Sequence, residues 1–531
     1  MTTAPADPIR ASYLVRCSAA DAEGAARAIA FEQTVEVPED FIKDDALRER
    51  IVGRVRSVAP QPGARDLHRV EIDYNPLLGG GRLPQLLNLV FGNVSIYPEV
   101  RLVDLRLPDA FLARFRGPRY GVEGLRRLLG VHGRPLLATA VKPMGAGLEH
   151  FERVVRDFAL GGGDIVKDDQ NLADETPADF LRRVERCQRA VEEADRSTGR
   201  RALYLPHLTG TQEELEERLR ALHGLGVRGV LACPAILGLE NTRSFAEKHG
   251  LVLMAHPAFS GTLYAGREPR VDPGLYLGTL MRLVGADVSI FPNAGGRFAF
   301  TPEDCAGVSR RLAEPLGTLK AAFPAPAGGM RFESLAGMAE RYGAESVFLV
   351  GGALLSHHED VRRGTEAFLG AMRKLFKERL EAPSAEEAFS SACELPSAKK
   401  GAVLDRLAFR PDWSWEGRPA SAYKADETLP FQGVSRRELV GAHGEKTAFD
   451  LRYFELAPGG HTSLEKHAHT HTVVCVRGRG VLVKGKKRVE LGGMDIGYVG
   501  PFETHQLRNE GAEPFGFFCI VDRERDRPVA P

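Results

Sequence analysis

The stretch Gly162-Gly163-Asp164-Ile165-Val166-Lys167-Asp168-Asp169-Gln170-Asn171 ends a short apolar run with one lysine and two aspartates. A short apolar run bounded by glycines is typical of a buried strand in a parallel sheet. When such a lysine stands alone at a strand end, it is more often salt-bridged or solvent-exposed than functional. What Lys167 does therefore depends on the segments around it.

Short β-rich segments alternate with amphipathic helical ones from about residue 135 to about residue 375. This alternation predicts βα units and a parallel sheet. The expected strands are Leu136–Lys142, Asp164–Asp168, Ala202–His207, Gly229–Cys233, Leu251–His256, Asp287–Pro292, Ala322–Ala327 and Ser346–Val350. These units predict a (β/α)₈ TIM barrel, in which the active site lies at the carboxyl ends of the strands. Polar residues or glycines follow almost every expected strand, among them Lys142, Asp169, His207, His256 and Asn293.

The barrel, assigned to residues 116–383, is expected to have a domain on each side. Residues 1–115 predict a small α+β domain with a helix at Ala19–Ile29 and strands at His68–Tyr74 and Arg101–Leu107. Residues 384–430 lose helical periodicity and gain Pro, Ser and charge, which indicates a linker or an extended lead-in. Residues 431–531 show alternating strands with Gly punctuation and predict a small all-β barrel.

Length and composition agree with a multidomain cytoplasmic protein. A chain of 531 residues exceeds what one hydrophobic core supports. No apolar run reaches the roughly 20 residues that cross a bilayer, and the N-terminus lacks the features of a secretory signal. Lys plus Arg and Asp plus Glu both number 71 without a basic block, which argues against a nucleic-acid partner. Seven cysteines without CxxC pairs predict reduced thiols.

Three histidines alternate in the run His467-Ala468-His469-Thr470-His471, which leads into an apolar strand. On a strand, alternate side chains share a face, so the three imidazoles are expected to point the same way. An expression tag is the alternative explanation, but tags are terminal and contiguous. The pattern predicts a metal site built from His467, His469, His471 and the later His505.

The segments of the expected barrel resemble the RuBisCO superfamily in order and spacing. The resemblance covers roughly residues 10–375 and rests on Phe91-Gly92-Asn93, Gly133-Arg134-Pro135-Leu136-Leu137, Val141-Lys142-Pro143, residues 162–171, Leu253-Met254-Ala255-His256 and two glycine pairs. It implies that CO₂ converts Lys167 to a carbamate that binds Mg²⁺ together with Asp169. It also implies that Lys142 transfers protons and that His256 forms the opposite wall.

Other matches concern the partner subunit and the substrate. Glu32 and Asn93 match residues that one subunit inserts into the active site of its partner, so a homodimer is implied. The resemblance also implies a phosphorylated small-molecule substrate whose phosphate meets backbone N–H groups of glycines, namely Gly328, Gly329, Gly351 and Gly352.

Several positions depart from the carboxylating enzymes. Gln170 stands where the family has its third metal ligand, a Glu, so the site loses one negative charge. Met144, Pro257 and Ala327 replace the second active-site lysine, a phosphate-binding Arg and a Ser. The chain therefore resembles the non-carboxylating RuBisCO-like proteins. The segment 31–38, Phe-Glu-Gln-Thr-Val-Glu-Val-Pro, most resembles the group that isomerises 5-methylthioribulose 1-phosphate.

The histidine cluster resembles the two motifs of cupins. His471 stands where a cupin usually has Glu, and Glu465 precedes the cluster, so the fourth ligand stays open. Imidazole ligands favour Mn, Fe, Ni or Zn over Mg²⁺. Certain separate cupins remove the methylthio group from 1-methylthioxylulose 5-phosphate. The thiol for that step would come from Cys519 or Cys475, assisted by a thiol reductant such as glutathione, although a lone Cys among aromatic residues is more often a core residue.

The first expectation is thus a bifunctional sulfur-salvage enzyme, in which the barrel isomerises and the cupin removes the methylthio group. A second is a RuBisCO-like enolase or decarboxylase for another sugar phosphate, fused to an independent cupin isomerase or dioxygenase. A third is a protein that no longer catalyses and senses a phosphorylated metabolite.

Overall fold

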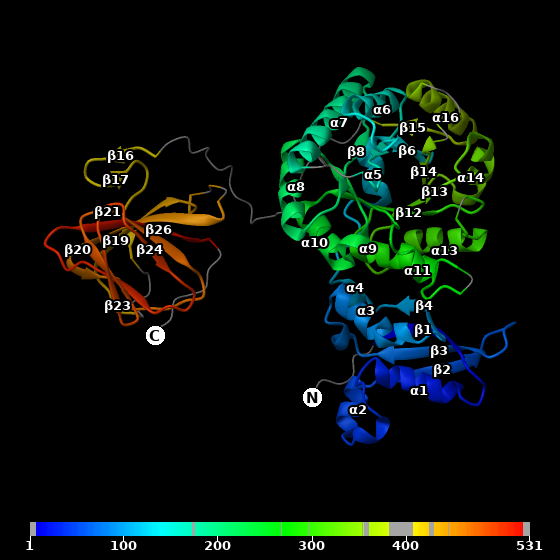
Figure 1. Cartoon of the computed structure of the whole chain (residues 1–531), viewed down its shortest axis with the longest axis horizontal. Coiled ribbons are helices and arrows are strands. Elements are labelled where there is room, and N and C mark those ends of the chain that lie inside the picture. The colour runs from blue at the N-terminus through cyan, green and yellow to red at the C-terminus, as the bar shows by residue number, and fades with distance from the viewer. Residues whose placement is uncertain are drawn as a thin grey trace. The chain divides into compact units, whose positions relative to one another are not determined.

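The computed structural model divides the chain into two compact units, Met1–Cys393 and Glu394–Pro531 (Figure 1). It describes residues 7–172, 176–266, 268–296, 298–352, 354, 360–381, 407–423, 429–443, 445 and 447–523. Much of the segment that was expected to be a linker, residues 384–406 and 424–428, lies outside this described part. None of the described helices is both long and apolar enough to cross a membrane.

The first unit begins with an antiparallel sheet in the order β2-β3-β1-β4. Its strands are β1 (Ile9–Arg16), β2 (Arg54–Pro60), β3 (Leu67–Tyr74) and β4 (Val100–Arg106). Its helices are α1 (Ala22–Glu32), α2 (Asp45–Ile51), α3 (Leu83–Phe91) and α4 (Asp109–Leu112). The predicted α+β domain is confirmed, but β1 and β2 were not expected. The side chains of β2 are exposed or half-buried, and its sequence lacks the alternation of apolar and polar residues by which a strand is predicted.

A parallel barrel follows, and every expected strand is present. Its strands are β6 (Leu136–Ala140), β7 (Ile165–Lys167), β8 (Leu203–Leu205), β9 (His207–Leu208), β10 (Gly229–Ala232), β11 (Val252–Ala255), β12 (Val288–Pro292), β13 (Phe323–Ala327) and β14 (Val347–Leu349). The order β8-β7-β6-β14-β13-β12-β11-β10-β9 closes the ring, because β8 and β9 are two parts of one strand. Pro206 separates them, since proline has no N–H to donate to the sheet.

Helices surround the barrel strands (Figure 1). They are α6 (Leu148–Leu160), α7 (Pro177–Thr198), α8 (Gln212–Gly224), α9 (Pro234–Leu237), α10 (Leu239–His249), α11 (Gly261–Tyr264), α12 (Met281–Val284), α13 (Pro302–Ala313), α14 (Leu335–Tyr342) and α16 (Val361–Leu375). Inside the ring, apolar side chains of the strands pack with Val122, Leu125 and Leu129 of α5 (Gly121–Leu129). A filled interior of this kind leaves chemistry to the strand ends.

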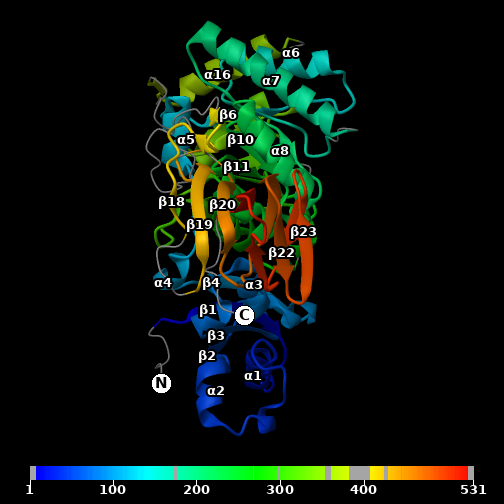
Figure 2. The same ribbon diagram turned by 90° about the vertical axis from the view of Figure 1, so that its left-hand side faces the viewer.

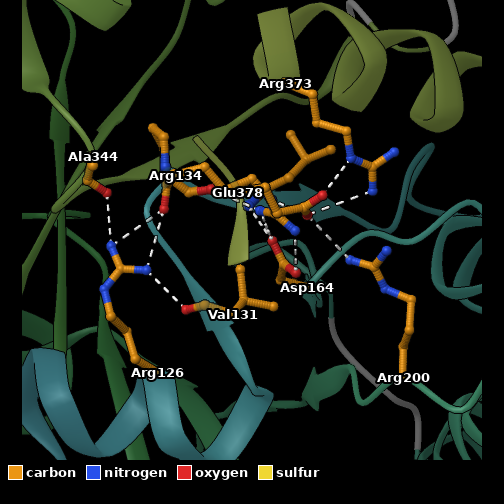
Figure 3. Close-up of polar contacts among 10 residues, drawn as sticks. Arg126, Val131, Arg134, Asp164, Arg200, Ala344, Arg373 and Glu378 are labelled. Atoms are coloured by element: carbon orange, nitrogen blue, oxygen red, sulfur yellow. Dashed lines mark hydrogen bonds and ion pairs between the residues drawn. The ribbon is translucent and has the colours of Figure 1, made fainter. Parts of the chain in front are cut away.

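A buried ionic network joins the amino-terminal ends of β6 and β7 (Figure 3). Arg134 is 0% exposed and donates to Asp164 over 2.6 and 3.0 Å and to Glu378 over 2.7 Å. Asp164 also accepts the backbone N–H of Leu137 over 2.7 Å. Arg373 forms a second ion pair with Glu378 over 2.5 Å. Arg134, in the segment that resembles the RuBisCO superfamily, therefore links the starts of β6 and β7 to Glu378, and its role is structural.

The second unit is an antiparallel β-barrel (Figure 2). Its strands are β19 (Gln432–Val440), β20 (Phe449–His461), β21 (His471–Arg477), β22 (Gly480–Lys484), β23 (Lys487–Leu491), β24 (Ile496–Val499), β25 (His505–Arg508) and β26 (Phe515–Asp522). Part of the expected lead-in belongs to this unit, because β18 (Ser421–Ala422) pairs with β19. Trp415, at the end of β17 (Ser414–Trp415), packs against Leu439 and Tyr453.

Candidate active site and metal centre

A cavity of ≈ 1590 Å³ opens at the carboxyl ends of the barrel strands. Its lining includes most of the residues that the sequence singled out in the barrel: Lys142, Lys167, Gln170, His256, Gly328, Gly329, Gly351 and Gly352. These residues come from distant parts of the chain and meet because parallel strands end at the same rim. This volume exceeds the roughly 300–1,000 Å³ of a typical small-molecule site, so a small metabolite fits inside it.

Lys167, Asp169 and Lys142 form a charged group beside this cavity. Lys167 is 3% exposed, and its Nζ donates to the carbonyl of Asp168 over 3.0 Å. Burial lowers the pKa of Lys167 to about 8. Burial works to raise the pKa of Asp169, but the hydrogen bonds from Lys142 and from the Asn171 N–H outweigh it and hold that pKa below its usual range. Lys167 thus has an accessible uncharged form next to a stable carboxylate.

The neighbouring Asp168 has a different role. Its carboxylate accepts from Arg183 over 2.5 Å, from the Tyr204 hydroxyl over 2.7 Å and from the His207 N–H over 2.9 Å. It is 1% exposed and fully engaged, so it fixes β7 against β8. Of two adjacent aspartates, only Asp169 remains for chemistry.

His256 stays uncharged at neutral pH. Burial, followed by the positive charge of Lys167, lowers its pKa to about 3. Its Nδ1 accepts the backbone N–H of Ala258 over 3.1 Å. That hydrogen bond assigns the proton to Nε2, so His256 is a neutral hydrogen-bond donor at the cavity.

Glu32 and Asn93 contact each other, with the Asn93 Nδ2 donating to the Glu32 carboxylate over 2.9 Å. Neither is among the described residues that line the barrel cavity of their own chain. The insertion of these residues into a partner's site stays a prediction.

In the second unit, three histidines converge. One ring nitrogen each of His467, His471 and His505 lies within 4.8 Å of the others. The Nε2 atoms of His471 and His505 are 3.0 Å apart. Each Nδ1 has a partner of its own: the His469 carbonyl for His467, the Cys519 thiol for His471 and the Glu503 carbonyl for His505, over 2.7, 3.2 and 2.8 Å. Nδ1–H donation of this kind leaves Nε2 as the metal ligand.

The expected strand geometry of residues 467–471 is wrong. Residues 467–470 belong to no strand, with a bend at 468–469, and β21 begins only at His471. The ring of His469 stacks on that of His467 with a centroid distance of 3.6 Å, and His469 is not part of the converging triad. The apolar strand that follows misled the prediction, because alternation alone does not show where a strand starts.

Glu465 is a fourth candidate ligand. Its backbone forms a bridge with His505, and its carboxylate accepts the hydroxyl hydrogen of Ser463. It is 8% exposed. A buried carboxylate at this place suits a metal site, since buried charges are paired or bind metals.

The two cysteines of this unit differ in their surroundings. The Cys519 Sγ lies 3.2 Å from His471 Nδ1 and accepts from Arg452 Nη2 over 3.3 Å. The Cys475 Sγ, in a fully buried residue, instead faces the carbonyl of Gly478 at 3.6 Å. Only Cys519 touches the triad.

Comparison with known proteins bears on both units. The catalytic domain of the ribulose bisphosphate carboxylase large chain matches residues 121–296, and the cupin domain matches residues 452–521. Ribulose bisphosphate carboxylase-like protein 1 of Rhodopseudomonas palustris is 37% identical over 358 residues, which cover 67% of this chain and 95% of that protein. The chain belongs to the RuBisCO-like proteins. It also carries a C-terminal cupin domain.

Two further relatives agree with this assignment. The 5-methylthioribulose-1-phosphate isomerase of Rhodospirillum rubrum is 36% identical over 368 residues, covering 69% of this chain and 96% of that enzyme. A crystal structure of a Rubisco-like protein from Rhodopseudomonas palustris matches with a TM-score of 0.63 at 34% identity, covering 69% of this chain and 98% of that one. Like the isomerase, this RuBisCO-like protein is an enzyme.

Donor chemistry in the RuBisCO-like barrel fits Mg²⁺. The uncharged amine of Lys167 is the form that reacts with CO₂, and the carbamate would add an anionic oxygen next to Asp169 and the amide of Gln170. Oxygen donors of this kind suit Mg²⁺. In the cupin, the free Nε2 atoms of the triad suit a divalent transition metal.

Sequence reasoning missed part of the cavity of the RuBisCO-like protein. Arg331, an exposed cation directly after the Gly328–Gly329 pair and Met330, lines it. So do Phe259 and Phe298, which are 82% and 51% exposed. Arg331 carried a signal, because a cation next to a glycine pair is typical of a phosphate site. The two aromatic residues carried none.

Proposed function

We propose that the chain is a bifunctional enzyme for methylthio-sugar phosphates in sulfur salvage. The barrel isomerises 5-methylthioribulose 1-phosphate to 1-methylthioxylulose 5-phosphate. The cupin then removes the methylthio group and leaves 1-deoxyxylulose 5-phosphate. The observation that carries the proposal is the Cys519 thiol 3.2 Å from a histidine of the triad, on the same chain as a barrel related to an isomerase of this substrate.

In the barrel, isomerisation requires a proton to leave one carbon beside a carbonyl and to return at another. We assign the proton transfers to Lys142, because its side chain lines the cavity, is 45% exposed and is ion-paired with Asp169. The Nε2–H of His256 donates to the substrate oxygen that gains negative charge. Mg²⁺ held by carbamylated Lys167, Asp169 and Gln170 would stabilise the same charge. Backbone N–H groups at the two glycine pairs bind the phosphate.

In the cupin, the Cys519 thiolate attacks the sulfur of the methylthio group. The sulfur–sulfur bond forms as the C1–S bond breaks, and its electron pair moves into the C1–C2 enolate, which takes a proton at C1. Two equivalents of an external thiol such as glutathione reduce the mixed disulfide and release methanethiol. The metal bound by His467, His471 and His505, with Mn, Fe, Ni and Zn as the candidates, would polarise the substrate carbonyl.

The test uses three full-length variants, phosphorus NMR and a measurement of methanethiol release. Fed with 5-methylthioribulose 1-phosphate and a thiol, the intact chain is expected to give 1-deoxyxylulose 5-phosphate and methanethiol. His471→Ala should accumulate 1-methylthioxylulose 5-phosphate, and Lys167→Ala should leave the substrate unchanged. No turnover by the intact, metal-loaded chain would overturn the proposal. A Cys519→Ala chain that releases methanethiol at the parent rate would remove Cys519 from it.

The oligomer belongs to the same proposal. Glu32 and Asn93 match residues that complete a partner's site, so we infer a homodimer as the active form. Mixing Asn93→Ala chains with Lys167→Ala chains is expected to restore about a quarter of the activity, since one site in four of the random dimers receives two intact contributions. Absence of any rescue after subunit exchange would contradict a shared site.

A further inference from the structure

Arg452 projects into the interior of the cupin barrel. Along β20, Phe454 and Leu456 belong to the interior cluster, whereas Tyr453 and Leu451 pack outside against Trp415. Alternate residues of a strand share a face, so Arg452 lies on the same side as Phe454. Cys519, directly opposite Arg452 on β26, also belongs to the interior cluster. A positive charge therefore points into the barrel that holds the histidine triad.

The contacts of Arg452 leave its charge without a carboxylate. Its Nη2 donates to the Cys519 Sγ over 3.3 Å, and its guanidinium lies 5.2 Å from the centre of the Phe454 ring. Its Nε is buried and has no hydrogen-bond partner. Within the described part of the chain, Arg452 forms no ion pair. Arg452 is half-buried, and a buried N–H group without a partner is uncommon, so this arrangement needs an explanation.

Acidic residues nearby are engaged elsewhere. Glu438 lies directly opposite Arg452 on β19, but its carboxylate forms an ion pair with Arg436 over 3.4 Å. The Oδ1 of Asp450 lies against Gly441. Arg436 faces the same interior and also has a buried Nε without a partner. Glu438 is thus bound to Arg436, and Arg452 is the guanidinium in this part of the barrel that has no carboxylate partner among the described residues.

We propose that Arg452, with Arg436 beside it, binds the phosphate group of the ligand that the histidine triad holds. The inference deepens the proposed function, since it rests on a phosphorylated sugar as the substrate of the cupin. A guanidinium offers several N–H donors in one plane and matches the oxygens of a phosphate monoester. A single thiol, that of Cys519, separates this guanidinium from His471. One ligand can therefore span the phosphate site, the thiol and the triad.

The field of Arg452 reaches the triad. The Arg452 guanidinium and the His471 ring contact the same Cys519 thiol, over 3.3 and 3.2 Å, so the charge of Arg452 lies close to the triad. An anion bound at Arg452 would neutralise part of this positive charge. Phosphate binding and metal binding in the barrel are therefore expected to support each other.

Inorganic phosphate and Mn²⁺ serve as probes in the first experiment. All proteins are full-length and carry Lys167→Ala, which removes Mn²⁺ from the vicinity of phosphate in the TIM barrel. The broadening of the phosphorus NMR signal by cupin-bound Mn²⁺ is titrated in this background and in Arg452→Gln and Arg488→Gln variants of it. Arg488 is the matched control, because it is exposed and forms an ion pair with Glu510 over 2.6 Å outside the interior.

The expected result is an affinity for phosphate about tenfold or more weaker in Arg452→Gln and unchanged in Arg488→Gln, because a charge-assisted hydrogen bond is lost. Equal broadening in both variants, at equal Mn²⁺ content and unchanged circular dichroism, would overturn the proposal. The readout needs no turnover. Phosphate binding that depends on Arg452, in a chain whose parent releases no methanethiol, would therefore contradict the proposed function and leave the phosphate site standing.

The kinetics of methanethiol release distinguish phosphate binding by Arg452 from an effect of Arg452 on the Cys519 thiol. Arg452→Gln is expected to raise KM by about tenfold with a smaller change in kcat, and Arg452→Lys should recover part of the loss. A fall in kcat at unchanged KM would show that Arg452 acts on Cys519 alone and would overturn the phosphate assignment.

Discussion

The two ends of β7 carry the same residue types and do opposite things with them. At the amino-terminal end, Asp164 is enclosed with Arg134 and Glu378, and the charges satisfy one another (Figure 3). At the carboxyl end, Lys167 and Asp169 lie beside a cavity of ≈ 1590 Å³. The role of a charged residue in this barrel therefore depends on its surroundings. Charges that are enclosed and paired with one another stabilise the fold, whereas charges beside a cavity can bind a ligand.

The largest effect is expected from breaking the closed end. Arg134→Met leaves the carboxylate of Asp164 buried without its ion-pair partner, which costs about 3–5 kcal/mol of unfolding free energy. Urea unfolding of the first unit measures it. Arg189→Met, which removes an exposed ion pair with Glu185, is the control and should change stability by less than about 1 kcal/mol. Similar losses in both variants would contradict a structural role for Arg134.

The matching change at the open end should affect turnover and spare the fold. Lys167→Met is expected to lower isomerase turnover by about 10³-fold, on the order of what a metal ligand or proton-transfer group contributes. Its melting temperature should equal or exceed that of the parent, because a buried ammonium is removed. Retained activity would show that the barrel does not use Lys167.

Acid should weaken the closed end through Glu378. Burial works to raise the pKa of Glu378, but hydrogen bonds from Arg373 and Arg134 lower it to about 2. Because the pKa in the folded state lies below the unfolded value, this stabilisation is present above about pH 4.5 and is lost as the pH falls toward 2. The melting temperature should therefore fall less between pH 6 and pH 3 in Glu378→Gln than in the parent. An equal fall in both proteins would show that Glu378 does not cause the loss of stability in acid.

A smaller change should come from Gln170. Gln170→Glu restores a negative charge beside Asp169, and Mg²⁺ is expected to bind about tenfold more tightly, which equals about 1.4 kcal/mol. Calorimetric titration in the presence of CO₂ measures it, with Gln85→Glu, an exposed position on α3 outside the cavity lining, as the control. Unchanged affinity would place Gln170 outside the metal's reach.

The barrel and its rim could be predicted because each depends on a local pattern. Alternating apolar segments located every barrel strand, and strand ends located Lys142, Lys167 and His256. Sequence patterns gave wrong or no predictions where contacts between distant residues determine the local structure. The partly exposed strand β2 has no apolar period, and residues 467–470 look like strand in sequence. Arg452 was missed for the same reason, since only the register of β20 with β26 shows that a lone arginine faces the thiol of Cys519.

The difference between charges that stabilise the fold and charges beside the cavity also separates the neighbouring residues Asp168 and Asp169. Substituting Asp168 would deprive Arg183, Tyr204 and the His207 N–H of their shared acceptor, so less folded protein would accumulate in a cell. Under the proposed function, substituting Asp169 would leave the amount of protein intact and abolish the activity of each molecule. The proposal thus assigns two neighbouring residues to different quantities in the cell, Asp168 to the number of enzyme molecules and Asp169 to the activity of each.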